Sequence, residues 1–191
     1  MLTVILAGGR SSRMGREKAL LPFQNSTMLQ VLIDRYAKAL GPVAVSVDEA
    51  GRFAFTGAAE LLDPAPGQGP LNGLISGFAV TFAPELFLTA TDLPLGDPAL
   101  VKRLAALRGS ADACLLRWDD GTPEPLFAVY GKSCLPAARA VMEQGRRSMR
   151  AMLETVSVRY VSPAELQEFD LTRILKNINT LSDYVELGLL T

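Results

Sequence analysis

The fold of this chain is decided by residues 2–18, which read LTVILAGGRSSRMGREK. Residues 2–7 form a short apolar run typical of a buried β-strand, and Gly8 and Gly9 follow it directly. Glycines leave room for a polyphosphate to approach the backbone amides. Cationic side chains then stand close together at Arg10, Arg13, Arg16 and Lys18. The pattern predicts a strand followed by a phosphate-binding loop, and the alternative is a tight strand-to-helix turn with a solvated basic face.

The spacing of these glycines excludes two common nucleotide loops. No G-x-x-x-x-G-K-[ST] pattern can be drawn through Gly8, Gly9 and Gly15, and no G-x-G-x-x-G occurs here. The sequence therefore argues against a P-loop ATPase and against a dinucleotide-dependent dehydrogenase. The cations of this loop, Lys18 and Arg13 among them, would offset the charge of a bound polyphosphate.

The composition limits the class of protein. The chain has 191 residues, of which 49% are apolar and 20% charged, so it can bury a full core, and we expect one domain over residues 1–191. A net charge of −1 argues against a broad basic surface for nucleic acid. The sequence contains neither a membrane-spanning apolar run nor a recognisable leader, so we expect a cytoplasmic protein without membrane contact.

Histidine is absent, which excludes a Ser-His-Asp triad and the usual zinc ligand. The two cysteines, Cys114 and Cys134, form no C-x-x-C pair, so we expect reduced, buried thiols. Whatever chemistry the chain performs must proceed without imidazole.

Strands and helices are expected to alternate, which favours a mostly parallel central sheet with helices on both faces. Helices are expected over residues 28–40, 71–82, 98–107, 134–143, 149–154 and 182–189. Further strands are expected over residues 43–47, 60–63, 86–91, 111–117, 126–130 and 157–160. Asp97 is read as the N-cap of the third of these helices, with Pro98 at its first position. The turn-rich residues 119–123 are read as a loop within one α/β domain.

A second motif, Asp92-Leu93-Pro94, follows the strand expected over residues 86–91. Ligands of open α/β sheets bind beyond the carboxyl ends of the strands, where Asp92 would project. Mg²⁺ needs oxygen ligands but keeps several waters and substrate phosphates, so one or two carboxylates suffice. Asp92 is therefore the predicted metal ligand, and an N-cap or turn role is the structural alternative.

The motif L-A-G-G-x-S-x-R-M-G-x-x-K, present from Leu6 to Lys18, resembles the signature of nucleotidyltransferases that activate small phosphorylated substrates. The chain is most similar to the molybdenum cofactor guanylyltransferase family, also called the MobA-like nucleotidyltransferases. The resemblance implies one Rossmann-like, GT-A-like domain with Mg²⁺ as cofactor. It also implies transfer of GMP from GTP to the phosphate of molybdopterin or the molybdenum cofactor, with release of pyrophosphate, to form molybdopterin guanine dinucleotide.

The resemblance assigns roles to individual residues. It implies nucleotide binding by Leu6, Ala7, Gly8, Gly9, Lys18, Ser46, Asp63 and Asp92. It also implies catalysis by Lys18, Arg13 and Asp92, with magnesium held by the aspartate of D-x-P. Ser46 stands where the best-known members have asparagine. On the acceptor side, the resemblance implies contacts from Asn177 and Asn179 of an N-x-N-T motif and from Arg147 of a basic turn. The alternatives there are a capping box of Thr180 with Asp183 and a solvated helix start.

Other functions stay open at this point. A cytidylyltransferase for the same pterin would be expected to carry a G-x-P-V-like segment where Glu124-Pro125-Leu126 stands. Another small-phosphate nucleotidyltransferase is a further alternative. A non-catalytic nucleotide-binding regulator should lack either Asp92 or Lys18. The partners expected from the resemblance are GTP and the pterin. We also expect transient contact with a cofactor-delivering protein or a molybdoenzyme, and we expect no binding of nucleic acid.

Overall fold

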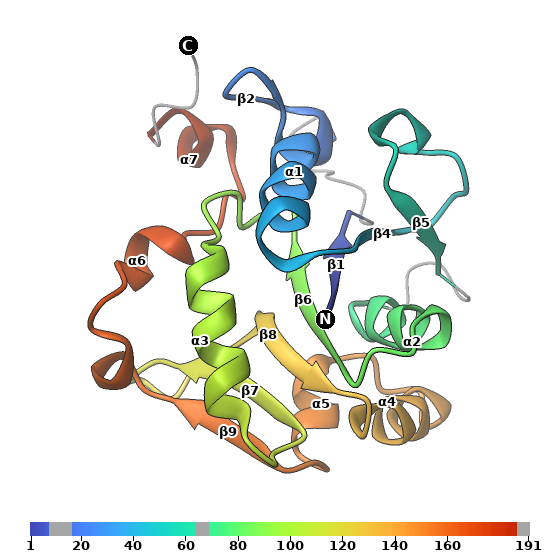
Figure 1. Cartoon of the computed structure of the whole chain (residues 1–191), viewed down its shortest axis with the longest axis vertical. Coiled ribbons are helices and arrows are strands. Elements are labelled where there is room, and N and C mark those ends of the chain that lie inside the picture. The colour runs from blue at the N-terminus through green and yellow to red at the C-terminus, as the bar shows by residue number, and fades with distance from the viewer. Residues whose placement is uncertain (8–16, 64–68, 187–191) are drawn as a thin grey trace.

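A computed structural model describes residues 1–7, 17–63 and 69–186, and its centre is a seven-stranded sheet (Figure 1). The strand order is β5-β4-β1-β6-β8-β7-β9. The strands are β1 (Leu2–Leu6), β4 (Val43–Val47), β5 (Ala59–Leu62), β6 (Glu85–Ala90), β7 (Ala113–Arg117), β8 (Pro123–Gly131) and β9 (Val158–Val161).

Most neighbouring strands of this sheet run parallel. The parallel pairs are β1 with β4, β1 with β6, β4 with β5, and β7 with β9, whereas β8 runs antiparallel to both β6 and β7. Leu6 is in register with Ser46 and with Ala90, so β1, β4 and β6 end at one edge of the sheet. Because β8 is reversed, its first residue, Pro123, pairs with the last residue of β7, Arg117. The beginning of β8 therefore lies at that same edge, which we call the ligand edge.

Helices cover both faces of the sheet, as the sequence predicted. One face carries α1 (Met28–Leu40) and α3 (Pro98–Arg108), and the other carries α2 (Leu71–Val80), α4 (Cys134–Glu143) and α5 (Met149–Leu153) (Figure 1). Shorter elements are η1 (Lys18–Leu20), β2 (Pro22–Phe23), β3 (Ser26–Thr27), η2 (Ala54–Thr56), η3 (Pro163–Leu166), α6 (Leu171–Ile174) and α7 (Leu181–Glu186).

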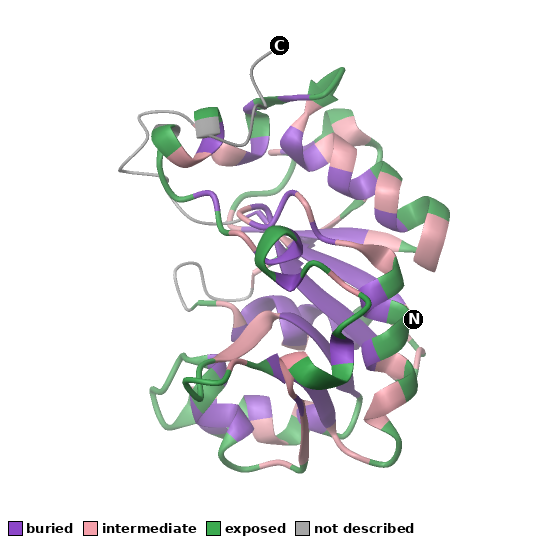
Figure 2. Cartoon of the chain, turned by 90° about the vertical axis from the view of Figure 1, so that its left-hand side faces the viewer, coloured by how far each residue is buried: buried purple, intermediate pink, exposed green. Residues whose placement is uncertain are grey.

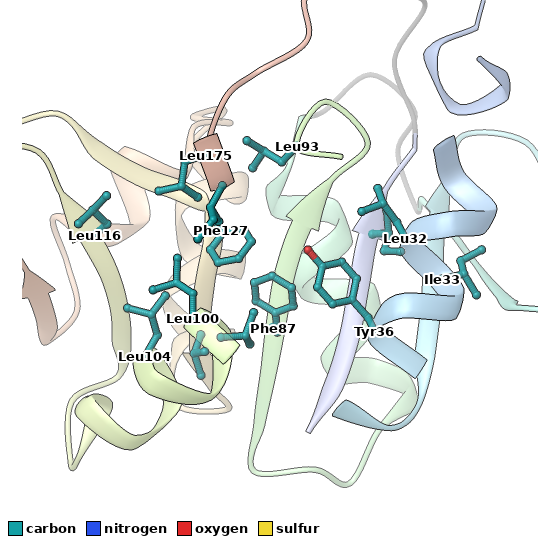
Figure 3. Packing of buried hydrophobic residues seen from close by; sticks show 14 of the residues in the cluster. Leu32, Ile33, Tyr36, Phe87, Leu93, Leu100, Leu104, Leu116, Phe127 and Leu175 are labelled. Atoms are coloured by element: carbon teal, nitrogen blue, oxygen red, sulfur yellow. The ribbon is translucent and has the colours of Figure 1, made fainter. Parts of the chain in front are cut away.

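The sheet separates two apolar cores because successive strand residues point to opposite faces. On β6, Phe87 packs into the core under α1 and α3, and Leu86 and Leu88 pack into the core under α2 and α4. The Phe87 ring makes edge-on contacts with Tyr36 of α1 and Phe127 of β8, with ring centroids 5.3 and 5.0 Å apart (Figure 3). Figure 2 shows the buried strands between helices whose outer surfaces are exposed.

Side chains at the helix starts explain where the helices begin. The Thr27 hydroxyl accepts from the Gln30 backbone N–H (3.2 Å) before α1. Asp97 accepts from the Ala99 N–H (2.7 Å) before α3, which confirms the predicted N-cap. Gly41, with φ of 102°, ends α1 in a conformation that favours glycine.

Thr180 and Asp183 form the predicted capping box. The Asp183 N–H donates to the Thr180 hydroxyl (3.1 Å), and Asp183 accepts from the Thr180 N–H (2.8 Å). This pair caps the start of α7, so the threonine of the N-x-N-T motif has the helix-capping role that the sequence analysis gave as an alternative.

The expected elements agree with the structure except at some ends and in several short pieces, which include the unpredicted 3-10 helices η1, η2 and η3. The helix expected over residues 71–82 ends at Val80, and the strand expected over residues 126–130 begins at Pro123. The β2–β3 hairpin and α6 were not predicted, and residues 187–189 of the last expected helix lie outside the described residues. Cys114 and Cys134 are buried free thiols, as expected. Among the described residues, no helix combines the length and apolarity that a membrane crossing needs.

Candidate active site

Backbone hydrogen bonds extend the parallel ladder into the ligand edge. The Ala7 N–H donates to the Ser46 carbonyl (3.2 Å), and the Thr91 N–H donates to the Leu6 carbonyl (3.1 Å). Leu6 and Ala7 therefore lie between the end of β4 and the residue that precedes Asp92. Gly8, Gly9 and Arg13, which the sequence also predicted for this site, lie outside the described residues.

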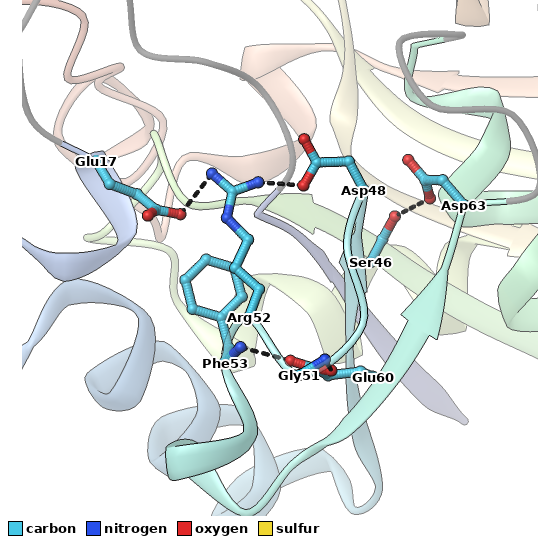
Figure 4. A network of polar contacts seen from close by, with 8 residues as sticks. All are labelled: Glu17, Ser46, Asp48, Gly51, Arg52, Phe53, Glu60 and Asp63. Atoms are coloured by element: carbon cyan, nitrogen blue, oxygen red, sulfur yellow. Dashed lines mark hydrogen bonds and ion pairs between the residues drawn. The ribbon is translucent and has the colours of Figure 1, made fainter.

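Ser46 and Asp63 form a pair at one end of this edge. The Ser46 hydroxyl donates to Asp63 Oδ1 at 2.7 Å, and Ser46 is 2% exposed (Figure 4). Burial raises the pKa of Asp63; the Ser46 hydrogen bond opposes this, and the charge of Asp48 adds to it. The pair presents hydrogen-bond acceptors, which suit ligand N–H groups such as N1 and N2 of guanine.

Asp92 lies at the centre of the edge, two residues after the end of β6. Its Oδ1 atom is buried and accepts no hydrogen bond. Burial raises the pKa of this carboxyl, and the charge of Lys18 opposes the rise. A buried carboxylate oxygen without a partner is costly unless a cation or donor meets it, so the donor chemistry fits a hard ion such as Mg²⁺.

The described residues form no cluster of metal-ligating side chains around Asp92. In the part of the chain that the structure describes, no group of three or more aspartate, glutamate or cysteine side chains could hold a metal ion. A metal bound here would complete its coordination with phosphate and water oxygens, as Mg²⁺ commonly does.

The C-terminal N-x-N-T motif meets the D-x-P motif at this edge. The Ile178 N–H donates to the Asp92 carbonyl (2.8 Å), and Ile178 is fully buried. Lys18 Nζ donates to Asn179 Oδ1 at 3.2 Å. The structure therefore brings Lys18, Asp92 and Asn179 together from segments far apart in sequence, and Asn177 is exposed beside them.

An arginine that sequence reasoning missed holds the segment that contains Lys18. Arg52 pairs with Glu17 (2.7 Å) and with Asp48 just after β4 (Figure 4). Burial alone would lower the pKa of Arg52, but the hydrogen bond to Asp48 and the charges of Glu17 and Asp48 raise it overall. Arg52 thereby ties the residue before Lys18 to the end of β4.

Arg35 of α1, also missed, holds the turn that follows Asp92. Its Nη1 donates to the carbonyls of Pro94 (2.6 Å) and Gly96 (3.0 Å). Gly96 packs so closely on α1 that a Cβ there would lie 2.2 Å from Tyr36 Oη. Both contacts join residues about 60 positions apart, so no local signal in the sequence reveals them.

Glu124 adds a second carboxyl group near Asp92, from the first residues of β8. The Trp118 indole N–H donates to Glu124 Oε1 at 2.6 Å. Burial raises the pKa of Glu124; the Trp118 hydrogen bond opposes the rise, and the charge of Asp92 adds to it. The reversed direction of β8 brings this residue to the ligand edge.

Two glycines of the segment Gly69-Pro70-Leu71-Asn72-Gly73 allow α2 to approach the edge. A Cβ on Gly73 would lie 2.3 Å from Leu6 Cδ2 and 3.3 Å from Ser46 Oγ. A Cβ on Gly69 would lie 3.0 Å from the carbonyl oxygen of Arg147. The turn that contains Arg147 therefore lies against the start of α2, and the Arg147 side chain is exposed.

Comparison with known proteins finds a matching family model and similar proteins in other organisms. A family model described as a MobA-like NTP transferase domain matches residues 3–161. A protein of Methanosarcina mazei named probable molybdenum cofactor guanylyltransferase is 33% identical over 94% of this chain and 86% of its own length. A protein of the same name from Carboxydothermus hydrogenoformans is 34% identical over 97% of this chain and 94% of its own.

Solved structures share the fold. Molybdopterin-guanine dinucleotide biosynthesis protein A of Archaeoglobus fulgidus superposes with a TM-score of 0.84 at 23% identity, covering 97% of this chain and 96% of its own. The 4-diphosphocytidyl-2C-methyl-D-erythritol synthase of Anaerococcus prevotii superposes with a TM-score of 0.69 at 9% identity, covering 97% and 92%. The second likeness shows that the fold is not tied to one reaction.

Proposed function

The chain belongs to the MobA-like NTP transferase family, and from that membership we propose that it transfers GMP from GTP to the phosphate of molybdopterin or the molybdenum cofactor. The products are molybdopterin guanine dinucleotide and pyrophosphate. The observation that carries the proposal is identity of 33–34% to relatives named guanylyltransferases, over nearly the whole chain. The meeting of Lys18, Asp92 and Asn179 at the ligand edge supports it.

The proposed reaction needs no general base to deprotonate the attacking group. An oxygen of the acceptor phosphate attacks the α-phosphorus of GTP, and a new P–O bond forms. The bond from the α-phosphorus to the oxygen that bridges to the β-phosphate breaks, and pyrophosphate leaves with that electron pair. Because the attacking phosphate is already ionised at neutral pH, a chain without histidine can perform the step by positioning and charge compensation.

On this proposal the two ends of the ligand edge bind different parts of the nucleotide. The Ser46–Asp63 pair and the backbone of Leu6 and Ala7 bind the guanosine end. Lys18, oriented by Asn179, contacts the phosphates and offsets their charge during transfer. Gly8, Gly9 and Arg13 stay predicted phosphate contacts, and Asn177, Asn179 and Arg147 stay predicted acceptor contacts.

We also propose that Asp92 holds Mg²⁺ together with oxygens of the nucleotide. The buried, unpartnered Oδ1 and the raised pKa of its carboxyl support this, because a cation would compensate the buried charge. When bound, the ion would neutralise part of the phosphate charge.

The test is pyrophosphate release with GTP, CTP, ATP or UTP, each with and without molybdopterin, in Mg²⁺ and in EDTA. We expect release with GTP only, dependent on the pterin and lost in EDTA. Selectivity for CTP would indicate a cytidylyltransferase, and a small phosphorylated acceptor other than the pterin would indicate another nucleotidyltransferase. Absence of release with every nucleotide would overturn the enzyme assignment and favour a nucleotide-binding regulator.

We place the reaction in the cytoplasm and expect transient contact with a protein that delivers the pterin or receives the product. Crosslinking in cell extract, with and without the pterin, tests for such contact. A crosslinked species that depends on the pterin supports this expectation, and its absence under both conditions contradicts it.

A further inference from the structure

A cavity of about 500 Å³ lies at the β7–β9 end of the ligand edge. Its walls include Arg117, Thr122, Pro123, Arg150, Leu153 and Tyr160. We propose that this cavity binds the heterocyclic ring system of the phosphate-bearing acceptor, while the acceptor phosphate faces Asp92. This assignment rests on the proposed transfer reaction.

The strand register gives the distance between the cavity and Asp92. Thr89 of β6 pairs with Phe127 of β8, and Asp92 and Glu124 each stand three residues beyond this pair on facing chains. Arg117 pairs with Pro123, next to Glu124, one strand further along. Two strand spacings separate β6 from β7, which amounts to roughly 10 Å. A ring system in the cavity can therefore carry a phosphate on a short linker to Asp92.

The cavity also lies on the face of the sheet that the nucleotide residues occupy. Gly73 of α2 contacts Leu6 and Ser46, and Gly69, before α2, contacts the turn of Arg147. Helix α5 begins two residues after Arg147 and lines the cavity. The ligand edge thus continues along one face from Ser46, past Arg147, to the cavity.

The stacked pair of Arg117 and Tyr160 suits a planar, polar ligand. The Arg117 guanidinium carbon lies 4.4 Å from the centre of the Tyr160 ring. Within the described residues, no carboxylate lies at ion-pair distance from Arg117, so its N–H groups can donate to ring oxygen and nitrogen atoms of a ligand. Leu153 and Pro123 supply apolar surface beside this pair.

The charges around the cavity favour the ring system over the phosphate as its occupant. Arg117 and Arg150 are matched by Asp120 and Glu154, and Arg150 already lies 3.6 Å from Glu154. A cavity with balanced charges gives little net attraction to a polyanion. Its volume falls in the range usual for small-molecule sites.

The test measures acceptor and nucleotide dependence separately in Arg117→Ala and Tyr160→Leu, with exposed Arg139→Ala of α4 as the matched control. At saturating GTP we expect KM for molybdopterin to rise about tenfold in both cavity variants, while KM for GTP changes less than about twofold. Arg117→Lys should recover part of the loss, because lysine keeps a donor but not the planar stack. Thermal unfolding of each variant identifies any that fails to fold.

Equilibrium dialysis of molybdopterin against wild type and Arg117→Ala, without nucleotide, decides the inference independently of turnover. Weaker binding by the variant supports the cavity as the ring site, and equal binding by folded variants overturns it. A rise in KM for GTP alone would assign the cavity to the nucleotide and also overturn it. Wild-type enzyme that binds the pterin but releases no pyrophosphate would refute the proposed function and not the cavity assignment.

Discussion

Lys18, Asp92 and Asn179 meet at one point, although they come from the beginning, middle and end of the chain. The sequence predicted all three, because each stands in a short motif whose residue types suit phosphate and metal chemistry. Arg35, Arg52 and Glu124 were not predicted as site residues. Arg35 and Arg52 act through contacts with segments distant in sequence, and a single sequence carries no periodic or local signal for such contacts. Glu124 contacts nearby Trp118, and the reversed direction of β8 brings it to the ligand edge.

Replacing Lys18 should abolish most of the transfer activity without unfolding the protein. Its ammonium group interacts with the carbonyl oxygen of the Asn179 side chain and with the charge of Asp92, which are both polar partners at the ligand edge. We expect Lys18→Ala to lower kcat for pyrophosphate release about 100-fold or more, the usual effect of removing a group that stabilises transition-state charge. Exposed Lys102→Ala on α3 is the control, and near-wild-type turnover by Lys18→Ala would remove the residue from the mechanism.

Asp92→Asn should make the metal-free protein more stable while it removes activity. Burial raises the pKa of Asp92 in the folded state, so the carboxylate destabilises the fold at neutral pH and the protonated form does not. We expect Tm in EDTA at pH 7 to rise by about 2–4 °C, the effect of roughly 1 kcal/mol in a domain of this size.

The sign of the pH dependence provides a separate check on Asp92. Stability lost through a raised folded-state pKa returns as the pH falls through that pKa, so the advantage of Asp92→Asn should shrink on acidification. The difference in Tm between Asp92→Asn and wild type should begin to shrink at a pH above 3.8, the ordinary pKa of aspartate. A constant difference in Tm between pH 7 and pH 4 would show that the carboxylate charge is not the cause.

At the scale of elements, the long helices and strands followed from periodicity, and the shortest elements did not. The limits of α1, β4 and α4 agree with the sequence prediction, and at α1 the Thr27 cap and Gly41 mark the same ends as the apolar spacing. The β2–β3 hairpin and α6 contain only a few residues each, too few for any period to appear. The hairpin packs against α1, and α6 contributes Leu171 and Ile174 to the core that α1 and α3 cover.

The contact between α2 and β1 depends on the missing side chain of Gly73. An added methyl group would lie 2.3 Å from Leu6 Cδ2, so Gly73→Ala should displace α2 and destabilise the fold by about 1–3 kcal/mol. The measurement is urea unfolding of Gly73→Ala, Leu6→Ala and the double variant. Because Leu6→Ala removes the clashing atom, we expect the double variant to be more stable than the sum of the single effects. Simple additivity would contradict this contact.

Helix α1 positions the turn after Asp92 through Arg35. Arg35→Ala removes two donors to the Pro94 and Gly96 carbonyls, so the turn should lose its fixed position. We expect kcat to fall about tenfold and the Mg²⁺ concentration for half-maximal rate to rise, with KM for GTP nearly unchanged. Arg35→Lys should recover part of the rate, and exposed Lys38→Ala on the same helix should match wild type. An unchanged Mg²⁺ dependence would limit Arg35 to a structural role.

At the scale of the whole molecule, the sheet keeps the two thiols in different cores. Cys114 packs with α1 and α3 and Cys134 with α2 and α4, and burial raises their pKa values to about 11 and about 12. At pH 8 we expect both to react with an aromatic disulfide reagent only when the fold opens, with matching rates that rise together in urea. Fast labelling of one thiol in native buffer would show that one core opens separately.

The residues proposed to bind the nucleotide and those proposed to bind the acceptor ring stand in different parts of the sequence, on either side of the switch in strand direction at β8. Residues assigned to the nucleotide lie mainly before the end of β6, whereas the proposed ring cavity is built around the short connection from β7 to β8. Turns of this kind accept insertions and deletions more readily than the strands they join. Changes in residues 118–122 can therefore alter acceptor specificity during evolution while nucleotide specificity is kept. The same residues are the positions to vary in laboratory evolution toward new acceptors.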